Sequence, residues 1–64
     1  MSAYREFIDE DDEVFRAEPY GSRSDEDAVI EFSRFPQGGE KPSRIVFYTK
    51  DAEKIIALIR EASK

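Results

Sequence analysis

Apolar and polar side chains alternate most clearly along residues 28–35. Ile30 and Phe32 alternate there with Glu31 and Ser33. A period of two residues is typical of a β-strand with one buried face. This segment is therefore predicted to be a strand that buries the side of Ile30 and Phe32.

Two further segments are predicted to be strands. Residues 44–49 are rich in β-branched and aromatic side chains, which favour strands. Residues 14–20 are predicted to form the first strand, and Pro19 indicates a strand end or an edge strand because proline cannot donate to a ladder. The segments between the three strands, 21–27 and 36–43, are rich in turn residues and are predicted to be loops.

The last segment, residues 51–64, has the apolar period of a helix. Thr49 or Asp51 can cap its N-terminus, and Leu58 widens its apolar stripe. The other apolar side chains that fall on one helical face are Ala52, Ile55, Ile56, Ile59 and Ala62.

The first thirteen residues are predicted to be peripheral. Tyr4, Phe7 and Ile8 have the spacing of one helical face, so a short helical turn could dock there. The acidic residues at 9–13 would repel one another in a continued helix. We expect this stretch to be mobile or loosely ordered.

These elements predict an α+β fold with the order β-β-β-α. Loops of seven or eight residues between the strands favour a three-stranded antiparallel meander followed by one C-terminal helix. We divide the chain into an acidic N-terminal arm, residues 1–13, and a single domain, residues 14–64. The helix is expected to cover one face of the sheet, with Ile55, Ile56 and Ile59 packed over Ile30, Phe32, Ile45 and Phe47.

The other face of the predicted sheet is half apolar. It carries Val29, Phe35, Val46 and Tyr48 among Glu31 and Ser33. A chain of this size buries only about 60% of the surface that its unfolded form exposes. A half-apolar face therefore favours a partner, and we expect a homodimer because two-fold dimers are the commonest assembly.

The 64-residue chain contains neither cysteine nor histidine. Their absence excludes disulfides, thiol nucleophiles, Cys/His zinc sites and histidine bases. A domain this small also has little room for a pocket that would separate the pKa values of two carboxyl groups. We expect a protein that is not an enzyme and that binds no metal and no cofactor.

The formal net charge of −5 comes from the N-terminal segment. Residues 1–14 hold six acids and one base, whereas residues 15–64 hold nine of each. The longest apolar run, residues 55–59, is far shorter than the ~20 residues that span a bilayer. We expect a soluble intracellular protein in the cytoplasm, without membrane contact.

The acidic cluster at 9–13 could in principle bind a hard cation through its carboxylates. It does not match the EF-hand pattern, because the sixth position from Asp9 is Val14 instead of glycine. We interpret it as a solvated acidic segment. An alternative is that it competes with nucleic acid for the protein's own basic residues, or mimics phosphate towards a partner.

Basic residues accompany aromatic residues along the predicted strands and loops. Single-stranded nucleic acid commonly binds to such a sheet, with bases stacked on rings and guanidinium groups holding phosphates. The alternative is a solvated strand face whose aromatic side chains are buried in a dimer. The candidate nucleic-acid-binding residues are Arg16, Arg34, Phe35, Lys41, Arg44 and Tyr48.

The stretch from Arg44 to Ile59 combines a hydrophobic strand that ends in an aromatic residue, an acidic cap and an amphipathic helix. It resembles the last strand and helix of a PUR-alpha-like repeat. Residues 30–45 are similar to the hairpin of the positive-cofactor-four-like domains. Together, residues 28–62 resemble these two groups of single-stranded nucleic-acid-binding domains.

The resemblance implies that the sheet binds nucleic acid and that the helices help to form an intertwined dimer. By the same resemblance, Arg34, Lys41 and Arg44 would contact phosphates, while Phe35 and Tyr48 would stack on bases. The chain departs from the pattern in its acidic charge, and in having three predicted strands where a PUR repeat has four. Residues 3–8 could supply an extra short strand, but our prediction does not include it.

Two hypotheses remain. In the first, a dimeric module binds single-stranded DNA or RNA on its sheet without catalysis. In the second, a small protein-interaction or regulatory module engages another protein through its apolar sheet face and acidic arm. Arginines that converge on one face with exposed rings would favour the first. Arginines paired with Glu18, Glu31 and Glu40 would favour the second.

Overall fold

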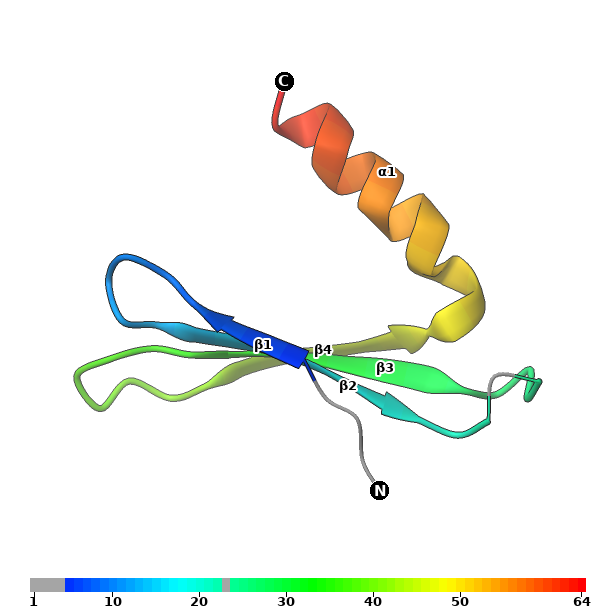
Figure 1. The fold of residues 1–64 in the computed structure, drawn as a ribbon, viewed down its shortest axis with the longest axis horizontal. Coiled ribbons are helices and arrows are strands. Elements are labelled where there is room, and N and C mark those ends of the chain that lie inside the picture. Colours follow the sequence, from blue (N-terminus) through cyan, green and yellow to red (C-terminus); the bar gives the residue numbers. More distant parts are fainter. Residues whose placement is uncertain (1–4, 23) are drawn as a thin grey trace.

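One antiparallel sheet followed by a helix makes up the fold (Figure 1). The computed structural model describes residues 5–22 and 24–64. Each strand pairs with the next one along the chain, so the sheet is a meander. The elements are β1 (Arg5–Ile8), β2 (Val14–Tyr20), β3 (Val29–Phe35), β4 (Ser43–Tyr48), the 3₁₀ turn η1 (Thr49–Asp51) and the helix α1 (Ala52–Ala62).

The predicted α+β class, with an antiparallel sheet and one C-terminal helix, is confirmed. The number of strands is not, because the sheet has four strands instead of three. The additional strand is β1, which pairs with β2 from Arg5 opposite Ala17 to Ile8 opposite Val14. Residues 5–8 of the expected acidic arm therefore lie in the same sheet as β2, β3 and β4.

The turn between β1 and β2 explains why residues 5–8 are extended. The Asp9 carboxylate accepts hydrogen bonds from the backbone N–H groups of Asp11 and Glu13, both at 2.9 Å. The backbone N–H of Asp9 also donates to the Glu13 carbonyl at 2.9 Å. The acidic stretch thus forms a hydrogen-bonded turn. The short helical turn that was predicted for Phe7 and Ile8 is wrong, because both residues lie in β1. Tyr4, the third residue of that pattern, lies outside the described residues.

The register gives the sheet two different faces, because residues paired across strands lie on the same side. Face A is mainly apolar, and face B mixes charged, aromatic and aliphatic residues. Face A consists of Arg5, Phe7, Phe15, Ala17, Pro19, Ile30, Phe32, Arg34, Ser43, Ile45 and Phe47. Face B consists of Glu6, Ile8, Val14, Arg16, Glu18, Tyr20, Val29, Glu31, Ser33, Phe35, Arg44, Val46 and Tyr48.

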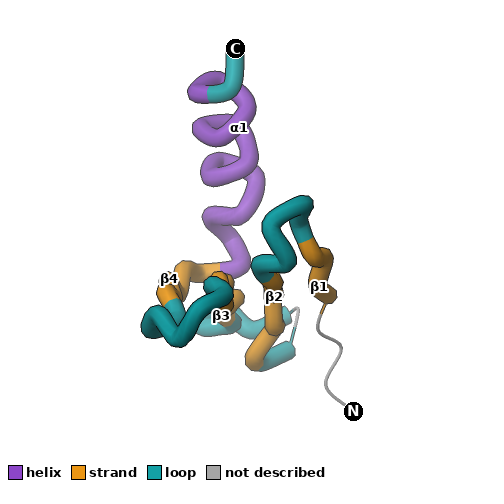
Figure 2. The backbone as a smooth tube through the Cα atoms, turned by 90° about the vertical axis from the view of Figure 1, so that its left-hand side faces the viewer, coloured by secondary structure: helices purple, strands orange, loops and turns teal. Residues whose placement is uncertain are grey.

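The helix α1 does not pack on the sheet of its own chain. It rises from the end of β4 and points away from the strands (Figures 1 and 2), and none of its residues is buried. The predicted packing of its isoleucines over face A is therefore wrong. The connection explains this, because the Thr49 N–H still donates to the Ala28 carbonyl at 2.9 Å and only η1 separates that bond from α1.

A single copy has almost no hydrophobic core. Among the described residues, only Ala28 and Ser33 are buried, at 5% and 6% exposure, and no large side chain is fully buried. The radius of gyration is 13.2 Å, whereas a compact chain of this length would have about 10.7 Å. The fold thus leaves the apolar surfaces of α1 and of face A uncovered.

Candidate functional site

Face B brings four of the six candidate residues together. Arg16, Phe35, Arg44 and Tyr48 come from β2, β3 and β4 and share this side of the sheet. Arg16 and Arg44 lie in one cross-strand row, separated by Ser33 on β3. The two guanidinium groups and the two rings therefore belong to one continuous surface.

Arg16 is held in place by two neighbours. Its guanidinium carbon lies 5.0 Å from the centre of the Phe35 ring, within the range of a cation–π contact. Its Nε atom donates to the Glu6 carboxylate at 3.1 Å. A planar guanidinium is the side-chain group that matches the geometry of phosphate oxygens and stacks on aromatic faces.

Arg44 is held more loosely. Its Nη1 atom lies 3.4 Å from the Glu31 carboxylate, and its side chain is 65% exposed. An exposed ion pair at this distance contributes little to stability. The Arg44 guanidinium can therefore exchange Glu31 for another anion at small cost.

Two residues that the sequence analysis did not select also lie at this site. Tyr20 is an exposed ring on face B, in the same cross-strand row as Tyr48, and the Lys50 Nζ atom lies 5.2 Å from the centre of the Tyr48 ring. Loss of solvation and the adjacent carboxylate of Glu18 raise the pKa of Tyr20. The two-residue period from Arg16 along β2 would have identified Tyr20.

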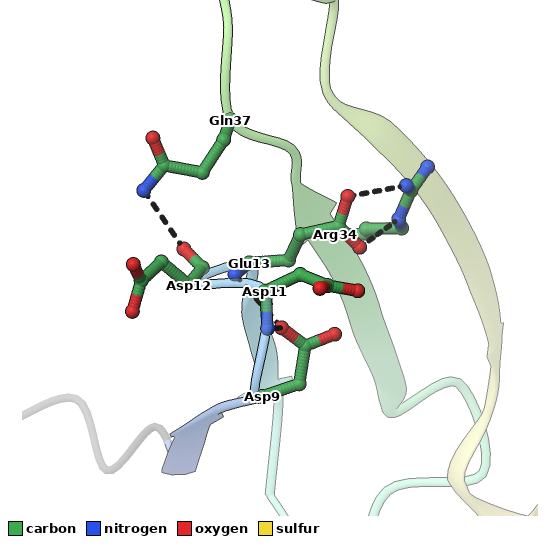
Figure 3. Close-up of polar contacts among 6 residues, drawn as sticks. All are labelled: Asp9, Asp11, Asp12, Glu13, Arg34 and Gln37. Carbon is green, nitrogen blue, oxygen red and sulfur yellow. Dashed lines mark hydrogen bonds and ion pairs between the residues drawn. The ribbon is translucent and has the colours of Figure 1, made fainter.

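Arg34 does not belong to face B. The register places it on face A, and it donates two hydrogen bonds to Glu13, from Nε at 3.0 Å and from Nη2 at 2.6 Å (Figure 3). These bonds and the charge of Glu13 raise the pKa of Arg34. Lys41 lies in the exposed loop between β3 and β4, outside the strand pairing. Neither residue lies in the strand positions that form face B.

The acidic turn is engaged in its own hydrogen bonds. Asp9 bonds the turn backbone, Glu13 bonds Arg34, and the Gln37 side-chain amide donates to the Asp12 carbonyl at 3.1 Å (Figure 3). Within residues 5–22 and 24–64, no three carboxylates are grouped as metal ligands would be. The turn therefore has a structural role in the β1–β2 hairpin.

Both criteria set out for the two hypotheses are partly met. Arg16 and Arg44 converge on one face with rings, which favours nucleic acid. Each of the three candidate arginines, Arg16, Arg34 and Arg44, also has a carboxylate partner. Only Glu31, the partner of Arg44, was among the expected ones; Arg16 binds Glu6 and Arg34 binds Glu13. Since Glu6, Glu18 and Glu31 share face B with two arginines, the charges on this face are mixed.

Comparisons with other proteins add no evidence to these structural observations. In the part of the chain that is described, no helix is long and apolar enough to cross a membrane. No family model matches the sequence, and neither a curated protein nor a solved structure matches the chain.

Proposed function

We propose that this protein is a non-catalytic binding module that holds single-stranded nucleic acid on face B and works as a homodimer. The observation that supports it is the grouping of Arg16, stacked on Phe35, with Arg44 and Tyr48 on one side of the sheet. Single-stranded nucleic acid needs this combination of rings and cations, without an enclosed pocket.

The rings and the arginines would bind different parts of the nucleic acid, the bases and the phosphates. Tyr20 and Tyr48 are two strands apart, which is about 10 Å at the usual strand spacing, so each ring can stack on a separate base. Arg16 and Arg44 lie two rows away, beyond the row of Glu18, Glu31 and Val46, and would hold phosphates. The exposed pairs with Glu6 and Glu31 are weak enough for a phosphate to replace the carboxylate.

The test uses two substitutions in one ion pair that should act in opposite directions. Fluorescence anisotropy would measure binding of labelled single-stranded DNA and RNA at about 50 and 200 mM salt. Arg44→Ala should weaken binding and lower the salt slope by about 0.7, the value for one phosphate contact on a single strand. Glu31→Gln should strengthen binding, because it frees Arg44 and removes a repelling charge.

A comparison of Arg44→Ala with Lys64→Ala distinguishes binding at face B from a general effect of charge. Lys64→Ala, at an exposed residue beyond the C-terminal end of α1, removes one positive charge away from the sheet. It should leave the affinity nearly unchanged. Equal effects of Lys64→Ala and Arg44→Ala would contradict a binding site on face B.

A second candidate function is the binding of another protein on face B. It is favoured by the carboxylate partners of Arg16, Arg34 and Arg44 and by the net charge of −5. Absence of nucleic-acid binding at tens of micromolar protein and about 50 mM salt would overturn the first proposal. The protein-binding function would then become the one to pursue.

A further inference from the structure

We propose that the open edge of β4 binds an extended segment of another protein as an added strand, and that this segment alternates acidic and apolar side chains. The proposal concerns the backbone at one edge of the sheet, whereas the proposed nucleic-acid site consists of side chains on face B. A failure of one is therefore distinguishable from a failure of the other.

β4 is the outer strand at one side of the sheet (Figure 2). Within the described residues it pairs only with β3. The helix α1, which follows β4, points away from the strands and does not lie along this edge. An outer strand leaves half of its backbone N–H and C=O groups without a partner in the sheet, so it can accept another strand.

One hydrogen bond indicates which backbone groups of β4 face outward. The Thr49 N–H donates to the Ala28 carbonyl, at the next position of the β3–β4 register. Hydrogen-bonded and non-hydrogen-bonded pairs alternate along an antiparallel ladder. The alternation assigns the backbone groups of Ile45 and Phe47 to β3. The backbone groups that face the open side belong to Arg44, Val46 and Tyr48.

The proline in β2 agrees with this assignment. Ile30 lies opposite Phe47 and bonds to β4 by the same alternation, so its backbone groups cannot also bond to β2. Its partner in β2 is Pro19, which has no N–H to donate. The assignment therefore leaves Pro19 without a missing bond to β3.

The side chains along this edge differ between its two sides. On face A, Ile45 is 58% exposed and has Phe47 as its neighbour. On face B, Arg44 lies exposed near one end of the strand, and the Lys50 Nζ atom lies over the Tyr48 ring at the other. An added strand alternates its side chains between the same two faces. Apolar side chains on face A and acidic side chains on face B would complement this edge.

Charge favours a foreign segment over a second copy of β4. Residues 41–50 contain three basic residues and no acidic one, in a chain with a net charge of −5. Two copies paired through this strand would bring the basic residues of both copies together, and like charges opposite one another are destabilising. An acidic segment is attracted by the same basic residues, which are Lys41, Arg44 and Lys50.

The other edge of the sheet does not suit such a segment. β1 has four residues against six in β4, and the acidic residues at 9–13 follow it directly. The Asp9 N–H donates to the Glu13 carbonyl at the next position of the β1–β2 register, so the outward backbone groups of β1 belong to Glu6 and Ile8. An acidic segment would be repelled there.

The first test uses a labelled peptide in which valine and glutamate alternate, and two N-methylated forms of it. Fluorescence anisotropy would measure their binding to the wild-type protein at low salt. In an antiparallel added strand, the glutamates lie on face B and their N–H groups point at β4. N-methylation of the glutamates should weaken binding at least about tenfold, because these donors are lost. N-methylation of the valines alters N–H groups that point to solvent and should change binding much less.

Matched proline variants test the same edge from the side of the protein. Val46→Pro removes an outward N–H of β4 and no bond to β3, and Ile8→Pro removes an outward N–H of β1. Val46→Pro should weaken peptide binding at least about tenfold, whereas Ile8→Pro should leave it nearly unchanged. The comparison of the two methylated peptides needs no protein variant, so it decides the question even where a proline variant does not fold.

Two further measurements test the charge and the backbone groups separately. A peptide with lysine in place of glutamate should bind at least about tenfold more weakly, because Arg44 and Lys50 repel it. Backbone hydrogen exchange in the free protein should be faster at Arg44, Val46 and Tyr48 than at Ile45 and Phe47, and the peptide should slow it at the first three.

Three results would overturn the proposal. The first is that the valine–glutamate peptide does not bind at about millimolar concentration, where a contact would have only the weakest measurable affinity. The second is an equal effect of the two N-methylations, since binding would then not depend on the groups that face β4. The third is slow exchange at Arg44, Val46 and Tyr48 in the free protein, since the edge would already be occupied. None of these measurements involves nucleic acid.

Discussion

Gly21 and Gly39 offer a matched test of the packing at the start of β3. Both have positive φ angles, 95° and 83°. A Cβ atom at Gly21 would lie 3.1 Å from the Ala28 Cα and 3.3 Å from the Ala28 Cβ, whereas nothing lies within 4 Å of a Cβ at Gly39. Replacing each glycine by alanine therefore separates the cost of the backbone conformation from the cost of the close approach.

Gly39→Ala should lower the free energy of unfolding by about 1 kcal/mol. A positive φ costs alanine about 1–2 kcal/mol, partly offset by the smaller entropy of its unfolded chain. Gly21→Ala carries the same cost and a steric cost of about 1–3 kcal/mol, because Ala28 is a buried backbone neighbour that cannot move aside. Its total loss should be about 2–4 kcal/mol.

Urea denaturation followed by circular dichroism would measure both losses. Both variants are compared at one fixed protein concentration, so that the comparison does not depend on association. The two variants should have similar slopes, which would show that both remain fully folded. If the losses agree to within about 0.5 kcal/mol, the close packing of Gly21 against Ala28 is refuted.

Two further predictions concern the β1–β2 turn. Glu13→Gln removes the negative charge that accepts both hydrogen bonds from Arg34. The urea midpoint should therefore fall, though less than for Gly21→Ala. An unchanged midpoint would mean that the Arg34–Glu13 pair adds nothing to stability. Asp12→Gly should raise the free energy of unfolding by about 0.5 kcal/mol, because Asp12 has a φ of 62° and is one of five adjacent acids. A lower stability of that variant, measured in the same way, would contradict this account of the turn.

The strands that could be predicted are those whose pattern depends only on local alternation. β2 was predicted with its observed bounds, and β3 and β4 to within one residue at each end. β1 was only an alternative, because the spacing of Tyr4, Phe7 and Ile8 favoured a helical turn. The pairing of β1 with β2, with the stacking of Phe7 on Phe15, depends on the turn at Asp9 and on no pattern within residues 5–8.

The candidate site was predictable to a similar extent. Alternation along each strand places Arg44 and Tyr48 on one side, and the register aligns them with Arg16 and Phe35. The same alternation assigns Arg34 to the other side. Its partner Glu13 is distant in sequence, so the pair could not be found from spacing alone. The apolar stripe of α1 indicated that an apolar surface packs against the helix. The sequence pattern does not say which surface this is.

The three-residue link η1 limits which surfaces the helix α1 can reach. A helix joined to its own sheet by a flexible linker has an effective concentration near face A in the millimolar range, far above that of a second copy in dilute solution. The short link η1, which directly follows the Thr49–Ala28 hydrogen bond, keeps α1 from reaching face A of its own sheet. About six flexible residues inserted after Thr49 would give α1 the reach to fold back. The same sequence elements would then form a closed monomer in which α1 covers face A of its own sheet.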